Sequence, residues 1–147
     1  MAALYRFKSL PKRLKSTLVK ATVLTHLTYP PIPLHVAAKS NIGRLQAIQN
    51  QALRFVHGVR WDDFITAERL HTENRKFLFA PINVVLYRRA KAVWRSIIER
   101  DGGNSERVRD ILDPDKLPIA KFHKNFKSSY IHAMERPLPE PLYTANR

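Results

Sequence analysis

The chain of 147 residues has the length of one domain, or of one domain with a tail. Its 44% of hydrophobic residues exclude a wholly disordered protein, and the lack of cysteine excludes a disulfide framework, a thiolate nucleophile and a cysteine-based zinc site. The formal net charge of +14 favours an anionic partner, with nucleic acid ahead of an acidic protein or a membrane surface.

The positive charge is concentrated in the first part of the chain. Residues 1–60 contain ten Lys or Arg and no acidic residue, whereas residues 61–147 contain sixteen basic and twelve acidic residues, which gives a net charge of +10 against +4.

No apolar run reaches the ~20 residues that a membrane-spanning helix needs, so we expect no membrane span. The stretch 1–27 is similar to a mitochondrial transit peptide, although its basic character continues to Arg60. The compartment therefore stays open between nucleus, cytoplasm and mitochondrion.

A first long helix is predicted from Lys12 to about Tyr29. Ser9-Leu10-Pro11 is a start signal, and the prolines between residues 30 and 33 end the helix. The apolar residues expected to share its buried face are Leu14, Leu18, Ala21 and Leu24. The basic residues expected on or beside its opposite face are Lys12, Arg13, Lys15 and Lys20.

A second long helix is predicted from Ser40, as its N-cap, to about His57, where Gly58 closes it. Its expected apolar face consists of Ile42, Leu45, Ile48, Ala52, Phe55 and Val56. Arg44 lies at the edge of this face, and Arg54 points away from it.

A third long helix is predicted from Pro81 to about Arg100, after a short helix that Asp62-Asp63 caps and that runs through Leu70. Its expected buried stripe is Ile82, Leu86, Ala90, Val93 and Ile97, with Trp94 on the flank. Its expected basic face is Arg88, Lys91 and Arg95.

The pattern weakens after Gly103. Two short helices are predicted at 105–112 and 119–134, and residues 136–142 predict an extended, polyproline-like tail. We therefore expect an all-α fold, a small helical bundle of three longer helices plus short helices, with an extended Pro-rich C-terminal tail. The expected division is a basic helical domain over 1–103 and an irregular extension over 104–147.

The sequence carries no strong signature of an enzyme. It lacks a Gly-rich phosphate loop, a nucleophile elbow and a zinc-protease motif, and its six histidines are scattered without i, i+4 pairing. Asp62-Asp63 is similar to the paired aspartates that hold magnesium in polymerases, but no acidic residue precedes it to supply a third ligand. Helix capping is the favoured interpretation, and we expect no catalytic residue, metal or cofactor.

Residues 45–54, Leu-Gln-Ala-Ile-Gln-Asn-Gln-Ala-Leu-Arg, resemble the L-Q-x-x-Q-N-x-A-L-R signature found downstream of the palm in reverse transcriptases of non-LTR retrotransposons, especially jockey-like LINE elements. Flanking segments agree in order, so that the resemblance covers roughly residues 9–100. It implies a thumb-like helical region that lies against a primer–template duplex and grips nucleic acid. Tyr29 departs from the family, which continues Tyr-Gly-x-x-x-Trp, and the chain lacks fingers and palm. The resemblance thus implies a fragment or a retroelement-derived protein that stands alone.

The leading hypothesis is a non-catalytic module that binds the phosphates of RNA, DNA or a hybrid. The basic residues expected to contact phosphates are Lys12, Arg13, Lys15, Lys20, Arg44 and Arg54, with Arg88, Lys91 and Arg95 as a second stripe. One alternative is a structural subunit of a larger ribonucleoprotein or organellar complex, repurposed from the same ancestor. The others are a solvated helix face and a membrane-surface helix over 12–28.

The glutamines of the resembling segment have a structural interpretation. Gln49 lies inside the apolar arc of its helix and Gln46 lies at the edge. Because a buried amide without partners costs ~1–3 kcal/mol, we expect both to bond to neighbouring backbone, such as the loop 30–35, rather than to bases.

Overall fold

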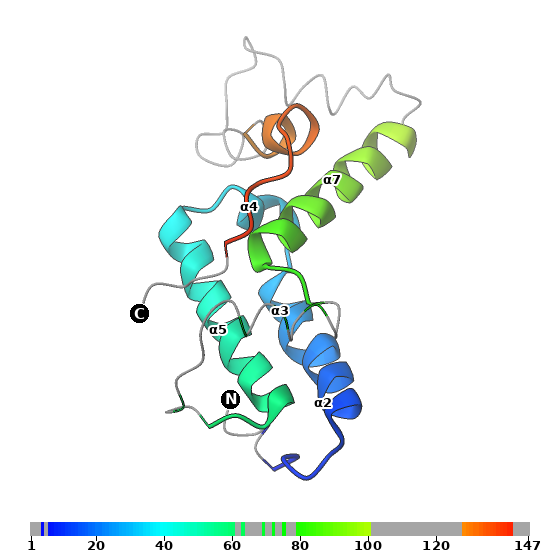
Figure 1. The fold of residues 1–147 in the computed structure, drawn as a ribbon. Helices are drawn as coiled ribbons and strands as arrows, with labels where there is room; N and C mark the ends of the chain where they lie inside the picture. The colour runs from blue at the N-terminus through cyan, green and yellow to red at the C-terminus, as the bar shows by residue number, and fades with distance from the viewer. Residues whose placement is uncertain are drawn as a thin grey trace.

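The protein is described by a computed structural model in which residues 4, 6–60, 63, 69, 72, 75, 79–100 and 128–142 are placed (Figure 1). This part of the chain contains helices and no strand, which confirms the predicted all-α bundle. The elements are α2 (Lys12–Val19), η1 (Lys20–Leu24), α3 (Thr25–Leu27), α4 (Pro31–His35), α5 (Lys39–His57) and α7 (Ile82–Arg100). Residues 128–134 are also helical. None of the helices in these ranges is both long and apolar enough to cross a membrane.

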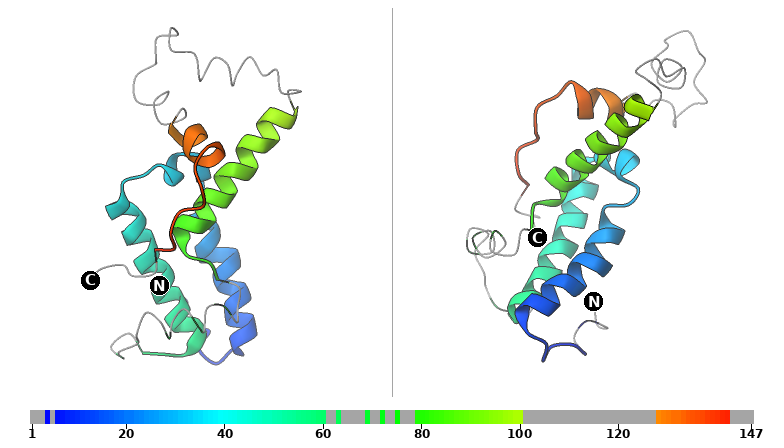
Figure 2. Two further views of the ribbon diagram at one scale, coloured as in Figure 1. Left: turned by 45° about the horizontal axis from the view of Figure 1, so that its top comes forward. Right: turned by 90° about the vertical axis from the view of Figure 1, so that its right-hand side faces the viewer.

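The helices form an antiparallel pair that a third long helix crosses. The run α2–η1–α3 leads along the length of this pair, α4 turns the chain, and α5 returns beside it (Figures 1 and 2). Helix α7 starts between α3 and α5 and then runs outward past α4. Residues 128–134 pack where α4 and α7 meet, and residues 136–142 return along the start of α7.

The buried side chains form three clusters along the bundle. The cluster between α2 and α5 contains Val19, Ala52, Leu53, Phe55, Val56 and Phe79. The middle cluster contains Leu27, Ile42, Ile82 and Leu86. The third cluster contains Ile32, Ala90, Trp94 and Ala133, and so joins α4 and α7 to the C-terminal segment. Burying each large side chain of this kind contributes roughly 1.5–3 kcal/mol.

The predicted buried face of the first helix is wrong at two of its four positions, whereas Leu18 and Leu24 are half-buried. Leu14 is 53% exposed and Ala21 is exposed, whereas Lys15, Ser16 and Val19 are buried. The aliphatic stem of Lys15 packs inward and places Nζ over the Phe55 ring, 5.3 Å from its centre, so a lysine occupies a position that hydropathy assigns to solvent. The π-helical turn η1 then widens the helix and shifts the register of the residues that follow it in this run.

The turn between the first two long helices is more ordered than predicted. Residues 31–35 form the short helix α4 rather than a loop. Pro31 and Pro33 are tolerated there because the N–H groups of a first helical turn have no intrahelical acceptor. The predicted N-cap Ser40 is also wrong, because α5 begins at Lys39 after Ala38 and no side chain caps it.

The ends of the long helices agree better with the sequence. Gly58 ends α5 in a left-handed conformation with φ of 70°, and Val59 N–H donates to Arg54 O over 2.9 Å in a Schellman motif. Helix α7 follows Pro81 and ends at Arg100, as predicted. The predicted stripe of α7 is wrong in one respect, since Trp94 is fully buried and Val93 is exposed.

Several predictions fall on other parts of the chain. The helices at 105–112 and 62–70, and the first part of 119–134, lie outside the described residues. In the C-terminal part that is described, residues 128–134 are helical and residues 137–142 have no regular secondary structure, as expected for the Pro-rich tail.

Candidate functional site

The segment that resembles reverse transcriptases contributes an amide network that joins α5 to the start of α7. Gln46 Oε1 accepts a hydrogen bond from Ile82 N–H over 2.9 Å, and Gln49 Nε2 donates to Ala80 O over 2.8 Å. Gln46 Nε2 donates to Gln49 Oε1 over 2.8 Å and to Asn50 Oδ1 over 2.9 Å. Both glutamine side chains are buried, with 2% and 1% exposed.

This network confirms that the glutamines bond to backbone, but the segment is 80–82 and not the predicted 30–35. The first N–H groups of a helix have no intrahelical acceptor, so Gln46 caps α7 from a neighbouring helix. The glutamines are therefore occupied in holding two helices together and are not directed at solvent.

The residues of α2 and η1 that were predicted to contact phosphates differ in their burial. Lys12, Arg13 and Lys20 are exposed, and Lys20 Nζ lies 5.1 Å from the centre of the Phe79 ring. Lys12 and Lys20 are eight residues apart, which is about 12 Å along a helix axis. Lys15, by contrast, is buried against Phe55, so its placement on the exposed side is wrong.

The two arginines of α5 differ in the same way. Arg44 is exposed near the start of the helix, at the opposite end of the antiparallel pair from Lys12 and Arg13. Arg54 is half-buried, and its Nη1 donates to Arg60 O over 3.0 Å and to Asp63 O over 2.8 Å. Its guanidinium therefore holds the turn that follows α5 instead of pointing freely to solvent.

The second stripe, on α7, contains two exposed arginines and one engaged lysine. Arg88 and Arg95 are exposed, whereas Lys91 is half-buried, with Nζ 3.4 Å from Tyr87 Oη. Sequence reasoning missed Arg89, whose Nη1 donates to the buried Thr28 Oγ1 and ties α7 to the end of α3. No local pattern could reveal this bond, because its partners are separated by 61 residues.

Six of the nine candidate cations are thus exposed. They are Lys12, Arg13, Lys20, Arg44, Arg88 and Arg95. They do not form one cluster: three follow α2 and η1, one lies at the far end of α5, and two lie on α7.

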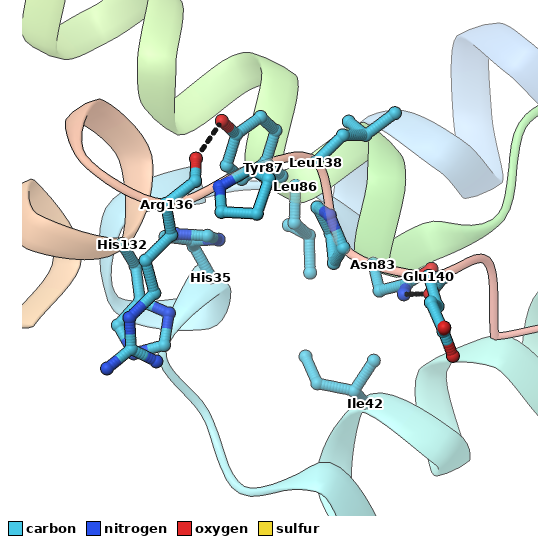
Figure 3. Close-up of a pocket in the computed structure, with 11 residues that line it drawn as sticks. His35, Ile42, Asn83, Leu86, Tyr87, His132, Arg136, Leu138 and Glu140 are labelled. Carbon is cyan, nitrogen blue, oxygen red and sulfur yellow. Dashed lines mark hydrogen bonds between the residues drawn. The ribbon is translucent and has the colours of Figure 1, made fainter.

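A separate pocket of about 430 Å³ lies where α4, α5 and α7 meet the C-terminal segment (Figure 3). His35, His132 and Arg136 lie at one end of it, and Asn83 and Glu140 lie at the other. Sequence reasoning did not identify this pocket, because its walls come from segments about a hundred residues apart.

The two histidines of the pocket both have a lowered pKa. The ring of His35 packs edge-on against Tyr87 and His132, with centres 5.6 Å and 5.7 Å apart. Burial lowers the pKa of His35 to about 4, and the charge on His132 adds to this effect. Burial also lowers the pKa of His132, with a further contribution from Arg136. His35 Nε2 is buried and has no hydrogen-bond partner.

The tail closes this pocket through three hydrogen bonds to α7. Tyr87 Oη donates to Arg136 O over 2.8 Å, and Asn83 Nδ2 donates to Glu140 O over 2.6 Å. Leu142 N–H donates in turn to Asn83 Oδ1 over 3.2 Å. The side chain of Asn83 therefore serves as both donor and acceptor for the tail backbone.

Across the residues that the structure describes, no three His, Asp or Glu side chains are grouped so that they could hold a metal ion. A comparison of the chain with protein-family models, curated proteins and solved structures gave no match.

Proposed function

We propose that the protein is a non-catalytic nucleic-acid-binding module derived from a non-LTR retrotransposon reverse transcriptase. In this proposal it grips the backbone phosphates of RNA, DNA or a hybrid. The observation that carries the proposal is the exposure of six of the candidate cations in a chain whose first sixty residues contain no acid. Exposed Lys and Arg can bind phosphates without first leaving internal partners.

The arrangement favours contacts to the backbone over contacts to bases. Lys12, Arg13 and Lys20 follow one continuous helical run, which suits a strand laid along it. Gln46 and Gln49, the two glutamines of the resembling motif, are buried and hydrogen-bonded within the bundle. Sequence preference is therefore expected to be weak.

The salt dependence of binding tests this proposal. If six phosphates are neutralised, log K falls against log salt with a slope of about −4 for a single strand and about −5 for B-form DNA. Fluorescence anisotropy with labelled single-stranded, duplex and hybrid oligonucleotides measures these slopes. A flat salt response, or no binding at low salt, would contradict the proposal.

Charge-matched variants test the assignment of residues. Replacing Lys12, Arg13 and Lys20 with Gln is expected to reduce the slope for a single strand by about 2. The control carries the same loss of charge at exposed residues outside the proposed contacts, Lys39, Arg75 and Arg100. An equal loss in both triple variants would show that only the net charge matters.

A second candidate function is an accessory subunit of a larger ribonucleoprotein or organellar complex. It is favoured by exposed apolar side chains in the N-terminal region, where Leu14 is 53% and Phe7 46% exposed and Ala21 is also exposed. Under this alternative, Leu14→Gln prevents co-purification with the complex and leaves oligonucleotide affinity unchanged. Under the first proposal, the purified chain is a folded, helical monomer without a partner.

A further inference from the structure

The pocket beneath the C-terminal segment has a cationic end with unused hydrogen-bonding capacity. His132 and Arg136 lie beside each other there, next to His35 (Figure 3). Only the backbone oxygen of Arg136 is bonded, to Tyr87, and its guanidinium has no acceptor among the described residues. His35 Nε2 is buried and has no partner. Three groups that can donate to an anion therefore meet at one place.

The rest of the pocket offers mainly apolar contacts. Ile42 and Leu86 are buried in the wall, and Leu138 is half exposed on the tail. Both the Nδ2 and the Oδ1 of Asn83 are already hydrogen-bonded to the tail backbone, so this side chain has little capacity left for a ligand. Glu140 lies at the end opposite the histidines, where it disfavours a second anion. The pocket is thus polarised, with one place for negative charge.

We propose that this pocket binds a small molecule that carries one carboxylate or phosphate group on an apolar body. The anionic group is held by Arg136 and His132 beside His35, and the apolar body lies against Ile42 and Leu86. The volume of about 430 Å³ falls within the range of small-molecule sites. This site is independent of the proposed grip on nucleic acid, because none of the nine candidate phosphate contacts lines it.

Binding is expected to strengthen as the pH falls. An anion beside the imidazoles favours their charged form and raises the pKa of both, so binding takes up protons. The other charged or titratable groups near them are Tyr87 and Lys91 on α7 and Arg136 and Glu140 on the tail, and α5 contributes the apolar Ile42. We assign the change with pH to His35 and His132, whose imidazoles face the proposed anion. Each proton taken up raises the affinity by up to about tenfold per pH unit.

The test uses the full chain with four probes: octanoate, phenyl phosphate, inorganic phosphate and uncharged octanol. Binding is measured from the imidazole NMR signals of the histidines at pH 5.5 and 7.5, together with the melting temperature. Octanoate, phenyl phosphate or both are expected to shift the signals of His35 and His132, to raise their pKa and to bind more tightly at pH 5.5. Octanoate alone identifies a carboxylate ligand, and phenyl phosphate alone identifies a phosphate ligand.

Two variants connect the effect to the pocket. Arg136→Gln, at an exposed side chain, is expected to weaken binding at least tenfold, whereas Arg88→Gln, at another exposed arginine, leaves it unchanged. The proposal is overturned if neither anionic probe shifts the histidine signals, or if Arg136→Gln binds as the parent does. It is also overturned if octanol or inorganic phosphate binds as tightly as the amphipathic probes.

Discussion

Replacing Gln46 with Met removes the amide that joins α5 to α7 while keeping most of the side-chain volume. Gln46 is 2% exposed, and the substitution leaves Ile82 N–H and Gln49 Oε1 without their partners. Asn50 is half-buried and can bond to water instead. At ~1–3 kcal/mol for each of these two orphaned buried groups, we expect the free energy of unfolding to fall by about 2–6 kcal/mol.

Gln49→Met has a smaller expected effect of about 1–2 kcal/mol, because its partner Ala80 O is only half-buried and Gln46 Nε2 keeps its bond to Asn50. The double variant is expected to lose less than the sum of the single losses, by about 0.5–3 kcal/mol, because each single variant already removes the hydrogen bond that the two glutamines share.

Urea unfolding followed by circular dichroism at 222 nm measures these differences. Gln51→Met is the matched control, because Gln51 is exposed on the same helix, and its effect should stay within about 0.5 kcal/mol. The reasoning fails if Gln46→Met changes stability no more than this control, or if the two single effects simply add. A loss of oligonucleotide affinity at unchanged stability would instead assign the glutamines to base contact.

Lys15→Ala is expected to lower the free energy of unfolding by about 2 kcal/mol, because the buried stem and the contact with Phe55 are lost. Lys15→Met should cost less than half of that, and both variants should keep the salt dependence of oligonucleotide binding. The pKa of His35 is about 4 in the folded chain and near 6.5 when unfolded, so its stabilising effect is complete above pH 6.5 and is lost as the pH falls toward 4. Allowing for solvent screening, the loss is about 1–2 kcal/mol, and urea titrations of His35→Phe should show a flatter pH dependence over that range. Gly58→Ala places a side chain at φ of 70° and should cost about 1 kcal/mol, measured by thermal unfolding.

Local signals in the sequence were sufficient for the end of α5, for both ends of α7 and for much of the core. Gly58 ends α5 and Pro81 precedes α7 because both act through their own backbone conformation. The buried face of the run from α2 through η1 could not be predicted in this way. Lys15 is counted as polar although its stem is buried, and the π-helical turn after Val19 changes the period on which such predictions depend.

The candidate sites were predictable to different degrees. The basic residues could be identified from charge alone, but whether a guanidinium is available depends on distant backbone, as the bonds from Arg54 to the turn at 60–63 illustrate. Burial of Gln49 followed from its place in the apolar arc, whereas its partner Ala80 lies 31 residues away. The pocket between His35 and His132 depends on a tertiary contact that no local spacing encodes.

The cluster around Trp94 also fixes the order in which parts of the bundle can form during synthesis. Helices α2 and α5 are close in sequence and can pack soon after Gly58 has been made. Trp94 and Ile32 must wait for Ala133, about 40 residues later, which is roughly 2–8 s at ribosomal speeds of ~5–20 residues per second. Until Ala133 has been made, this cluster lacks its C-terminal wall, so this end of the bundle is completed after the pair of α2 and α5.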